Sequence, residues 1–495
     1  MNQTIALIPA FSLVATISLW SQPTWEVKSS FPGFDRLQHC FQLGDSSIRC
    51  FGTFEPSGDT VIFVLVETFS GQGSLLSTKL YSASTLSVQG MVSAGTGGFY
   101  AIGRTYGHLG SIDPRERAKL LRFDQAGDTL WTKEYVVGCG VRFYSIVKTD
   151  SDQLAILATV CEPLDSIFKL IIAFIDNEGD LIDTVALHPL PYAHTRINVP
   201  FHYFSGAGFV LADQCLSGFC LAMTDQDGRN ARRGTPGQLP APGTWWIDGL
   251  NSYVPSSAMA GYIAVDVMGW NTTVSEDRLA VGFLRHSDTV ITWAKTYGSD
   301  DPDRWDRSSS IIRTSDENLL IVATWNFRQH FSFNTDADFW LIKVDTSGNV
   351  LWERRYGDNQ YQELYNVIET SDGGLLMNGI YAPRGSGPGG ADYYLIKVDK
   401  DGLMTHINGQ PVTAPILTAT PNPAREQLQL TWQLQTGQPD RVVLTDLTGR
   451  AMKHIGAEPT RNYLEVNVTG LAPGIYLCGL WSGNTQLAVT KVVVQ

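Results

Sequence analysis

The feature that most constrains the fold of this chain is a phrase that the sequence repeats. Residues 338–348 read DFWLIKVDTSG, and residues 392–402 read DYYLIKVDKDG. Asp345 and Asp399 hold the same place in the two phrases. A recurrence with a period of about 50 residues marks one supersecondary unit that buries its apolar face only by stacking on copies of itself.

Short strands and tight turns account for each part of the unit. The letters LIKV alternate in polarity, which predicts a strand with one apolar face. In the turn from Asp345 to Gly348 the aspartate bonds back to the backbone and the glycine takes a positive φ. A second turn, SDGG at residues 371–374, precedes another apolar run. About four strands in about 50 residues is the pattern of a propeller blade.

The same turn can be followed back through the chain. Its first residues are Asp124, Asp176, Asp225, His286, Asp345 and Asp399, which keep a nearly regular spacing. Trp131, Trp293 and Trp352 each follow by seven positions, and we expect such aromatic residues to pack between blades. A degenerate copy near residues 75–85 brings the count to seven. The sequence predicts an all-β propeller of roughly seven blades over residues 22–402, with six or eight as alternatives.

The charge and hydropathy of the chain exclude several classes of partner. The formal net charge is −13 and no basic cluster stands out, which argues against nucleic acid and anionic lipid. The long apolar run at residues 5–20 is short of the roughly 20 residues of a membrane-spanning helix. It resembles a secretory signal, and a cut after Ser21 removes residues 1–21. No second segment is long enough to cross a membrane.

Beyond a linker at residues 403–415 the repeat ends and a different pattern begins. Residues 416–495 alternate short apolar runs with turns such as Ala472-Pro473-Gly474. This pattern predicts a small all-β domain of about seven strands, a β-sandwich of the immunoglobulin-like type.

The order of motifs in residues 416–495 resembles the type A C-terminal sorting domain of cargo of the type IX secretion system of Bacteroidota. The resemblance rests on Pro421, Asn422, Pro423, Asp446, Gly449, Arg450, Pro473, Gly474, Tyr476 and Lys491. One departure is Cys478, where an apolar residue is commoner. The resemblance implies that the translocon and its sorting machinery are partners. It also implies passage through the periplasm, removal of the sorting domain, and a passenger anchored at the outer-membrane surface or released.

The repeats also resemble the secreted propeller-like passengers of that phylum. The shared features are the recurring phrases D-G-G and W-x-K-x-Y-G, which the chain shows at residues 372–374 and 293–298. This second resemblance is looser than the first and implies no activity.

Six of the seven cysteines fall into pairs that are symmetric about hairpin turns. The pairs are Cys40 with Cys50, Cys139 with Cys161, and Cys215 with Cys220. Antiparallel partners across a turn can lie within the spacing that a disulfide needs, and export permits oxidation. We predict three cross-strand disulfides and a free Cys478, with free buried thiols as the alternative.

Acidic and histidine clusters suggest a calcium or other metal site, but the repeat explains the first of them more simply. Residues 225–230, DQDGRN, have part of the spacing of a calcium loop and lack the glutamate at loop position 12. Residues 300–306, DDPDRWD, hold four carboxylates beside two arginines. His188, His194 and His202 lie close together in the sequence, although loop histidines more often face solvent. Because Asp225 is itself a blade turn, we predict no metal and no cofactor, with calcium as the alternative.

The function predicted from the sequence is binding rather than catalysis. The chain has no nucleophile elbow, HExxH motif, phosphate loop or dinucleotide fingerprint, so no catalytic residue is predicted. The first hypothesis is an exported, non-catalytic propeller that binds protein or glycan. The alternatives are a secreted polysaccharide hydrolase or lyase with carboxylates in the central pocket, and a structural surface-layer or gliding component. Carboxylates about 5–10 Å apart at the axis favour the enzyme, whereas backbone and small residues there favour binding.

Overall fold

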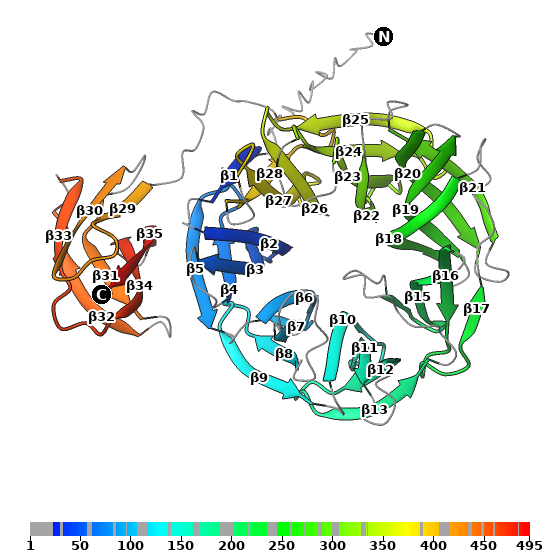
Figure 1. The fold of residues 1–495 in the computed structure, drawn as a ribbon, viewed down its shortest axis with the longest axis horizontal. Coiled ribbons are helices and arrows are strands. Elements are labelled where there is room, and N and C mark those ends of the chain that lie inside the picture. Colours follow the sequence, from blue (N-terminus) through cyan, green and yellow to red (C-terminus); the bar gives the residue numbers. More distant parts are fainter. Residues whose placement is uncertain are drawn as a thin grey trace, which may run out of the picture.

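A computed structural model gives the fold of the chain (Figure 1). It describes residues 23–495 apart from 30–32, 57–61, 83–85, 96, 106–116, 137–139, 162–167, 188–200, 216–217, 235–244, 258–259, 272–273, 286–289, 299–305, 328–332, 334, 387–389, 405–415, 434–437, 447–449, 459–460 and 484. The described elements are all strands, which form seven four-stranded sheets in a ring and a smaller two-sheet domain. The predicted class, an all-β propeller followed by a small β-sandwich, is confirmed.

Each sheet of the ring runs from an inner strand at the axis to an outer strand at the rim, with antiparallel neighbours. The first sheet comprises β2 (Gly33–Gln42), β3 (Ile48–Pro56), β4 (Phe63–Phe69) and β5 (Leu75–Ser82). The second comprises β6 (Leu86–Ser93), β7 (Phe99–Thr105), β8 (Ala118–Phe123) and β9 (Thr129–Tyr135), and the third β10 (Gly140–Lys148), β11 (Leu154–Cys161), β12 (Phe168–Ile175) and β13 (Leu181–Ala186). The fourth comprises β14 (Phe201–Phe204), β15 (Gly208–Cys215), β16 (Gly218–Met223) and β17 (Arg232–Gly234), and the fifth β18 (Trp245–Ser257), β19 (Ala260–Asn271), β20 (Val274–Arg285) and β21 (Val290–Tyr297). The sixth comprises β22 (Arg307–Arg313), β23 (Leu319–Trp325), β24 (Asp338–Val344) and β25 (Val350–Tyr356).

The first strand of the chain closes the ring by joining the last sheet. β1 (Trp25–Lys28) pairs antiparallel with β28 (Asp392–Val398), and the seventh sheet continues inward with β27 (Leu375–Ala382) and β26 (Tyr361–Glu369). The amine of Lys397 on β28 donates to the carbonyl of Pro23 at 3.1 Å. Both ends of the ring's chain therefore meet in one sheet. No helix long and apolar enough to span a bilayer occurs in the described part of the chain.

One turn recurs between the third and fourth strands of the sheets. In the turn that begins at Asp345, the carboxylate accepts a hydrogen bond from the amide four positions later at 2.8 Å. The first copy lies at Ser70–Ser74, where the Ser70 hydroxyl accepts from the amide of Ser74 at 3.1 Å in the same way. The prediction that this copy lies near residues 75–85 is therefore wrong, because residues 75–82 form the outer strand β5.

In the first, second, third, sixth and seventh sheets, an aromatic side chain from the outer strand of the preceding sheet donates a hydrogen bond to the backbone of this turn. The Tyr297 hydroxyl donates to the carbonyl of Gly348 at 2.8 Å, and Trp293 packs in the core between the fifth and sixth sheets. At the ring closure Trp25 takes the place of Trp293, because an added Cβ on Gly73 would lie 2.5 Å from its ring. Its indole N–H also donates to the carbonyl of Gly71, in the same turn, at 3.1 Å. The equivalent tyrosine bonds are Tyr81 to Gly127, Tyr135 to Gly179 and Tyr356 to Gly402. The prediction that these aromatic residues pack between blades is confirmed.

We expect Gly348→Ala to weaken the contact between the fifth and sixth sheets. Gly348 has φ +77°, and an added Cβ lies 2.9 Å from a Trp293 ring atom. The left-handed conformation costs an alanine about 1 kcal/mol, and the clash adds to it. The matched control is Gly206→Ala, where φ is +75° and the nearest atom, on Gln226, is 3.9 Å away. Denaturant unfolding should show a clearly larger loss for Gly348→Ala, and equal losses would contradict the contact.

The seam between the seventh and first sheets buries two carboxyl groups. Asp35 accepts from the amide of Tyr393 at 2.6 Å and from the Ser29 hydroxyl at 2.5 Å. Glu67 accepts from the Thr78 hydroxyl at 3.0 Å. Desolvation raises the pKa of Glu67 to about 7, although hydrogen bonds from Tyr393 and Thr78 oppose the rise. Desolvation also raises the pKa of Asp35 well above its usual value, against its bond from Ser29.

These carboxyl groups predict that the ring is more stable in mild acid. The pKa of Glu67 is about 7 in the folded protein and 4.5 in the unfolded chain. Its protonation therefore contributes its full stabilisation of the fold below pH 4.5. That contribution, about 3 kcal/mol, is lost as the pH rises through 7. Denaturation midpoints measured between pH 5 and pH 8 should fall with rising pH, and Glu67→Gln should flatten the profile. An unchanged slope in that variant would exclude Glu67 as the cause.

Residues 416–495 form the second domain from two facing sheets. One contains β29 (Ile416–Thr420), β30 (Gln427–Gln433) and β33 (Tyr463–Asn467). The other has the order β32 (Ala451–Gly456), β31 (Arg441–Thr445), β34 (Gly474–Ser482) and β35 (Thr485–Val494). Its core includes Leu430, Val466 and the free, buried thiol of Cys478, which confirms the prediction for that cysteine.

Candidate functional site

A pocket of about 890 Å³ lies where the turns between the first and second strands meet. Its walls come from the first, second and seventh sheets, as residues 40–44, 93, 95, 97–99 and 368–373, with Gln125 and Ser315 beside them. Inner strands converge on the axis because every sheet points its first strand inward (Figure 1). The pocket is therefore a product of the ring, because residues from its first and last sheets share one wall.

Backbone and small side chains dominate this wall. Gly95, Gly97 and Gly98 have φ of +76°, +100° and +105°, a region that favours glycine. A Cβ on Gly98 would lie 2.2 Å from the carbonyl oxygen of Phe123, so no larger residue fits without a backbone shift. Peptide groups and hydroxyls are thus presented where a larger residue would place a side chain. Backbone and small residues in the pocket wall are expected of a binding protein, and paired carboxylates of an enzyme, so this wall favours binding.

Both acidic side chains in the pocket wall already have partners. Glu369 accepts from the amide and the hydroxyl of Ser315, each at 2.7 Å, which joins the seventh sheet to the sixth. Asp372 accepts from the amine of the buried Lys397 at 2.5 Å and from the Thr370 hydroxyl at 2.5 Å. Desolvation of Asp372 opposes its ionisation, but these bonds outweigh it and hold its pKa below the usual value. The arrangement fixes turns rather than preparing a proton donor.

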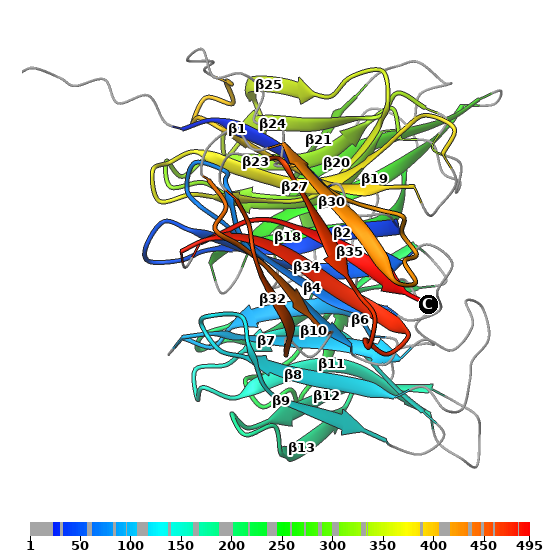
Figure 2. The same ribbon diagram turned by 90° about the vertical axis from the view of Figure 1, so that its left-hand side faces the viewer.

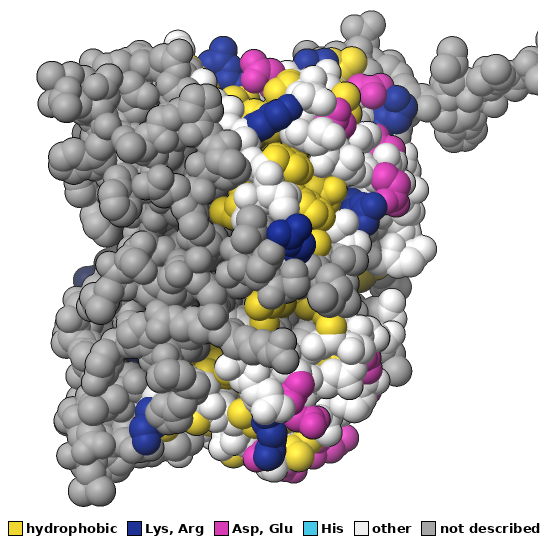
Figure 3. Space-filling view, turned by 90° about the vertical axis from the view of Figure 1, so that its right-hand side faces the viewer, with side chains coloured by type: hydrophobic (Ala, Val, Ile, Leu, Met, Phe, Trp, Pro, Cys, Tyr) yellow, Lys and Arg dark blue, Asp and Glu magenta, His cyan; other side chains and the backbone are white. Residues whose placement is uncertain are grey.

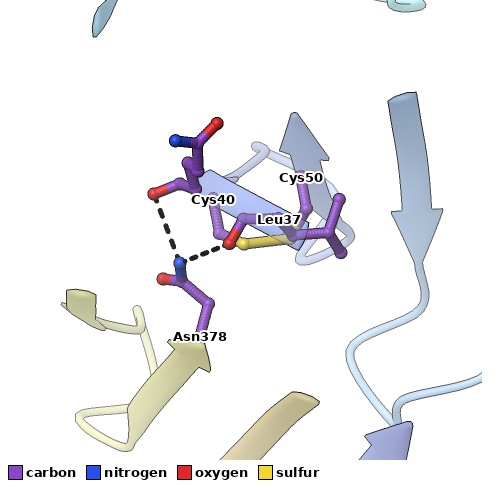
Figure 4. The surroundings of a disulfide bond; sticks show 5 residues. Leu37, Cys40, Cys50 and Asn378 are labelled. Atoms are coloured by element: carbon purple, nitrogen blue, oxygen red, sulfur yellow. Dashed lines mark hydrogen bonds between the residues drawn. A yellow bond between two sulfur atoms is a disulfide. The ribbon is translucent and has the colours of Figure 1, made fainter. Parts of the chain in front are cut away.

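The pocket wall also includes one of the predicted disulfides. Cys40 and Cys50 are direct partners on β2 and β3 and are bonded, with Cα atoms 4.1 Å apart (Figure 4). Beside them the Asn378 amide of β27 donates to the carbonyl of Leu37 at 2.9 Å, across the seam (Figure 4). In the pocket wall itself, the backbone amide of Ser371 donates to the side-chain carbonyl of Gln42 at 2.5 Å. The disulfide thus braces the inner hairpin that borders both the pocket and the closure.

A second polar cluster lies on the inner strands β22 and β26. The guanidinium of Arg307 is 3.6 Å from the carboxylate of Glu363, which also accepts from the Tyr361 hydroxyl at 3.1 Å. Desolvation raises the pKa of Glu363, and the positive charges of Arg307 and Arg36 oppose that rise. A carboxyl group of raised pKa can act as a general acid. The neighbouring arginines and tyrosine, however, stabilise the ionised form of Glu363 and lower its pKa. The cluster lacks the paired carboxylates expected of a glycoside hydrolase within the part of the chain that the structure describes.

The residues considered for metal binding have other roles or lie outside the described residues. Asp225 accepts from the amides of Asp227 and Arg229 and from the Asn230 side chain, as a turn residue. Burial lowers the pKa of His202 to about 4. His188, His194 and residues 300–305 fall outside the described residues. Among the described residues, no group of three or more metal-ligating side chains is present.

Two of the predicted disulfides remain predictions. Cys139 lies outside the described residues, and the backbone register places Cys161 opposite Gly140. The register sets Cys215 opposite Gly218, and Cys220 opposite Asp213. Peptide mapping of the unreduced protein tests both pairs.

A repeated tripeptide in the sequence marks two of the turns that border the pocket. Residues 314–316 and 370–372 both read TSD, and they are the turns that supply Ser315 and Asp372 to the pocket wall. In each, the aspartate pairs with a lysine of the same sheet, Lys343 or Lys397, at 2.6 and 2.5 Å. A repeated turn at the inner hairpin marks the axis, but the repeat alone does not tell which turns bound a cavity.

The described part of the ring's side near β17 and β21 gives little indication of a partner (Figure 3). On the side of the ring near β17 and β21, Figure 3 shows Lys and Arg side chains interspersed with Asp and Glu. Interspersed charges of this kind are usual for a solvated surface. The pocket at the axis is therefore the stronger candidate.

Residues of the C-terminal motif hold the second domain together. The Asn422 amide donates to the carbonyl of Lys491 at 2.7 Å and accepts from the amide of Val493 at 2.8 Å. The Tyr476 hydroxyl donates to the carbonyl of Ala472 at 2.8 Å. The turn after β31 is fixed by the Asp446 carboxylate, which accepts from the amide of Arg450, whereas Gly449 lies outside the described residues. Asn422 therefore fastens the last strand, whereas Tyr476 and Asp446 fix turns of the same domain.

Comparison of the ring with solved structures gives distant similarities. An acylaminoacyl peptidase of Pyrococcus horikoshii is 11% identical, with a TM-score of 0.41 over 82% of this chain and 59% of the peptidase. The chain thus spans less than two thirds of the peptidase. The β-propeller domain of the Trilobed protease of Pyrococcus furiosus is 10% identical, with a TM-score of 0.41 over 78% of this chain and all of that domain. The NanB sialidase of Streptococcus pneumoniae is 11% identical, with a TM-score of 0.38 over 76% of this chain and 70% of the sialidase.

The comparisons do identify the second domain. No curated protein matches the sequence, and similarities as distant as those of the ring carry no functional argument. Residues 419–495 match the family described as the secretion system C-terminal sorting domain. Residues 419–495 are therefore a type IX secretion sorting domain, which directs this propeller to the cell surface or extracellular space of a Bacteroidota bacterium.

Proposed function

We propose that this exported protein is a non-catalytic propeller that binds a neutral glycan at the mouth of its ring. The observation that carries the proposal is the composition of the pocket wall. It presents peptide groups, serines and glutamines, while its two carboxylates are engaged in joining turns. Such groups hydrogen-bond to sugar hydroxyls without demanding charge in the ligand.

The half-buried ring of Phe41 adds an apolar surface to the same wall, beside the buried ring of Phe99. Phe41 and Phe99 border the pocket and pack against each other with ring centroids 4.7 Å apart. Sugar rings have an apolar face as well as hydroxyls, so a wall of both kinds suits them. A protein loop inserted into the pocket is the other outcome that the experiment must distinguish.

We expect Gly44→Trp to abolish ligand binding without unfolding the ring. Gly44 borders the pocket and a Cβ there has no atom within 4 Å, so an indole can obstruct the pocket without disturbing the core. The matched control is Gly456→Trp on β32, where a Cβ is equally unobstructed. The measurement is binding to an array of neutral oligosaccharides and to immobilised proteins from the outer surface of the same bacterium.

Binding to oligosaccharides by the wild type and by Gly456→Trp, with at least tenfold weaker binding by Gly44→Trp, supports the proposal. Binding to immobilised protein alone would show that the ligand is a protein and not a glycan. Equal binding by all three proteins would place the ligand elsewhere on the molecule.

The second candidate function is polysaccharide cleavage at Glu363. It is supported by the raised pKa of this carboxyl, which desolvation maintains against the hydrogen bond from the Tyr361 hydroxyl. Release of reducing ends or unsaturated products from a polysaccharide, lost in Glu363→Gln and kept in Gly44→Trp, would favour this candidate.

A further inference from the structure

The two domains of the chain share one buried core. β35 lies against β5, the outer strand of the first sheet, and Figure 2 shows the second domain in front of that sheet. Along β34, Tyr476, Cys478 and Leu480 point into the sandwich, while Leu477 points the other way. Leu477 is only 9% exposed because it joins the buried cluster that contains Phe54 and Phe63 of the first sheet.

Three neighbouring side chains form this contact face on the second domain. Leu477 pairs with Lys491 across β34 and β35, and Gly479 pairs with Val489. Val489 packs on the same cluster as Leu477. The amine of Lys491 lies 5.9 Å from the ring centroid of Phe54, at cation–π distance. An apolar pair and a cation on one face thus meet the edge of the first sheet.

The contact lies where the closing strand has ended. β1 stops at Lys28, which is paired with Tyr394. The backbone of Asp35 bonds to Ala391, and Asp35 is the partner of Phe54, so Phe54 lies beyond the last pair of β1. At this level none of the described pairs of β1 with β28 covers the seam.

We propose that the sorting domain docks in cis on the ring closure, where it covers the end of the seam that β1 leaves open. The contact face is Leu477, Val489 and Lys491, and the surface it covers includes Phe54, Phe63 and Leu80. The sorting domain thereby caps the one seam that depends on strands from both ends of the ring. Its release uncovers an apolar patch beside the closing strand.

The first experiment cuts the linker without removing either domain. A site for a sequence-specific protease replaces part of residues 405–415 in the full chain, and the cleaved protein is run on a size-exclusion column at micromolar concentration. We expect the two fragments to co-elute, because a docked contact survives loss of the tether. Immediate separation of wild-type fragments would overturn the proposal.

Variants of the contact face test which residues hold the fragments together. Leu477→Glu with Val489→Glu places charge on the contact face and should make the cleaved fragments elute apart. The matched control is Met452→Glu, an exposed apolar residue on β32 of the same sheet. Co-elution of the double variant, or separation of the Met452 control, contradicts the assigned face.

Hydrogen exchange of the uncut chain keeps the result independent of how well the variant fragments fold. In the double variant, amides of β5 should exchange faster than in wild type, while amides of β9 on the second sheet should not change. If the variant sandwich unfolds, β5 must still lose protection, since the cap is gone. Unchanged exchange in β5 would show that the sandwich does not cover the seam.

Discussion

Removal of residues 416–495 is expected to leave the ring folded and to keep it from reaching the cell surface. The deleted residues form the sorting domain, with a core of their own around Leu430 and Val466. The seven sheets of the ring use no strand from this domain. Surface exposure, measured by labelling intact cells with an antibody against the ring, should fall to background while the protein accumulates inside the cell. Normal arrival of the truncated protein at the cell surface would show that residues 416–495 are not needed for sorting.

Two point variants separate the fold of the sorting domain from its recognition. Asn422→Ala removes both side-chain bonds from Asn422 to β35, a loss of about 1–3 kcal/mol, and should reduce delivery by loosening the domain. Arg450 contributes its backbone amide to the Asp446 turn, so Arg450→Ala leaves that bond intact. Loss of delivery in Arg450→Ala, with thermal stability unchanged, identifies the guanidinium as a group that the secretion machinery contacts.

The repeat was predictable because its turn chemistry is strict. A carboxylate that accepts the amide four positions later, followed by a glycine with positive φ, leaves a recognisable phrase at Asp124, Asp176 and Asp345. The first copy was misplaced because a hydroxyl replaces the carboxylate there. Ser70 accepts the same amide at 3.1 Å, but nothing in its identity distinguishes it from any other serine.

The ring closure and the pocket were beyond the reach of the sequence for a different reason. β1 is too short to show a period, and its partner β28 lies at the opposite end of the ring's chain. The pocket wall combines glycines and small polar side chains from turns that are far apart in the sequence. Non-local pairing decides both features, whereas a sequence pattern reports local preference.

Loss of β1 is expected to open the ring at the seventh sheet. Trp25 is 5% exposed, donates to Gly71, and stacks on Phe69 with centroids 6.4 Å apart. Trp25→Ala should therefore cost about 3–5 kcal/mol, and deletion of residues 23–29 should cost more. The predicted signal cut after Ser21 leaves β1 whole, whereas a cut beyond Lys28 would remove it.

The location of the damage distinguishes ring opening from general destabilisation. In Trp25→Ala, hydrogen exchange should rise most in β27 and β28, while β11 and β12 of the third sheet keep their protection. The matched control is Trp131→Ala, which removes the equivalent ring from the second sheet. Its exchange should rise around the second and third sheets, because no closure depends on it. Identical exchange patterns in the two variants would mean that the seam closed by β1 is no less stable than the seam between the second and third sheets.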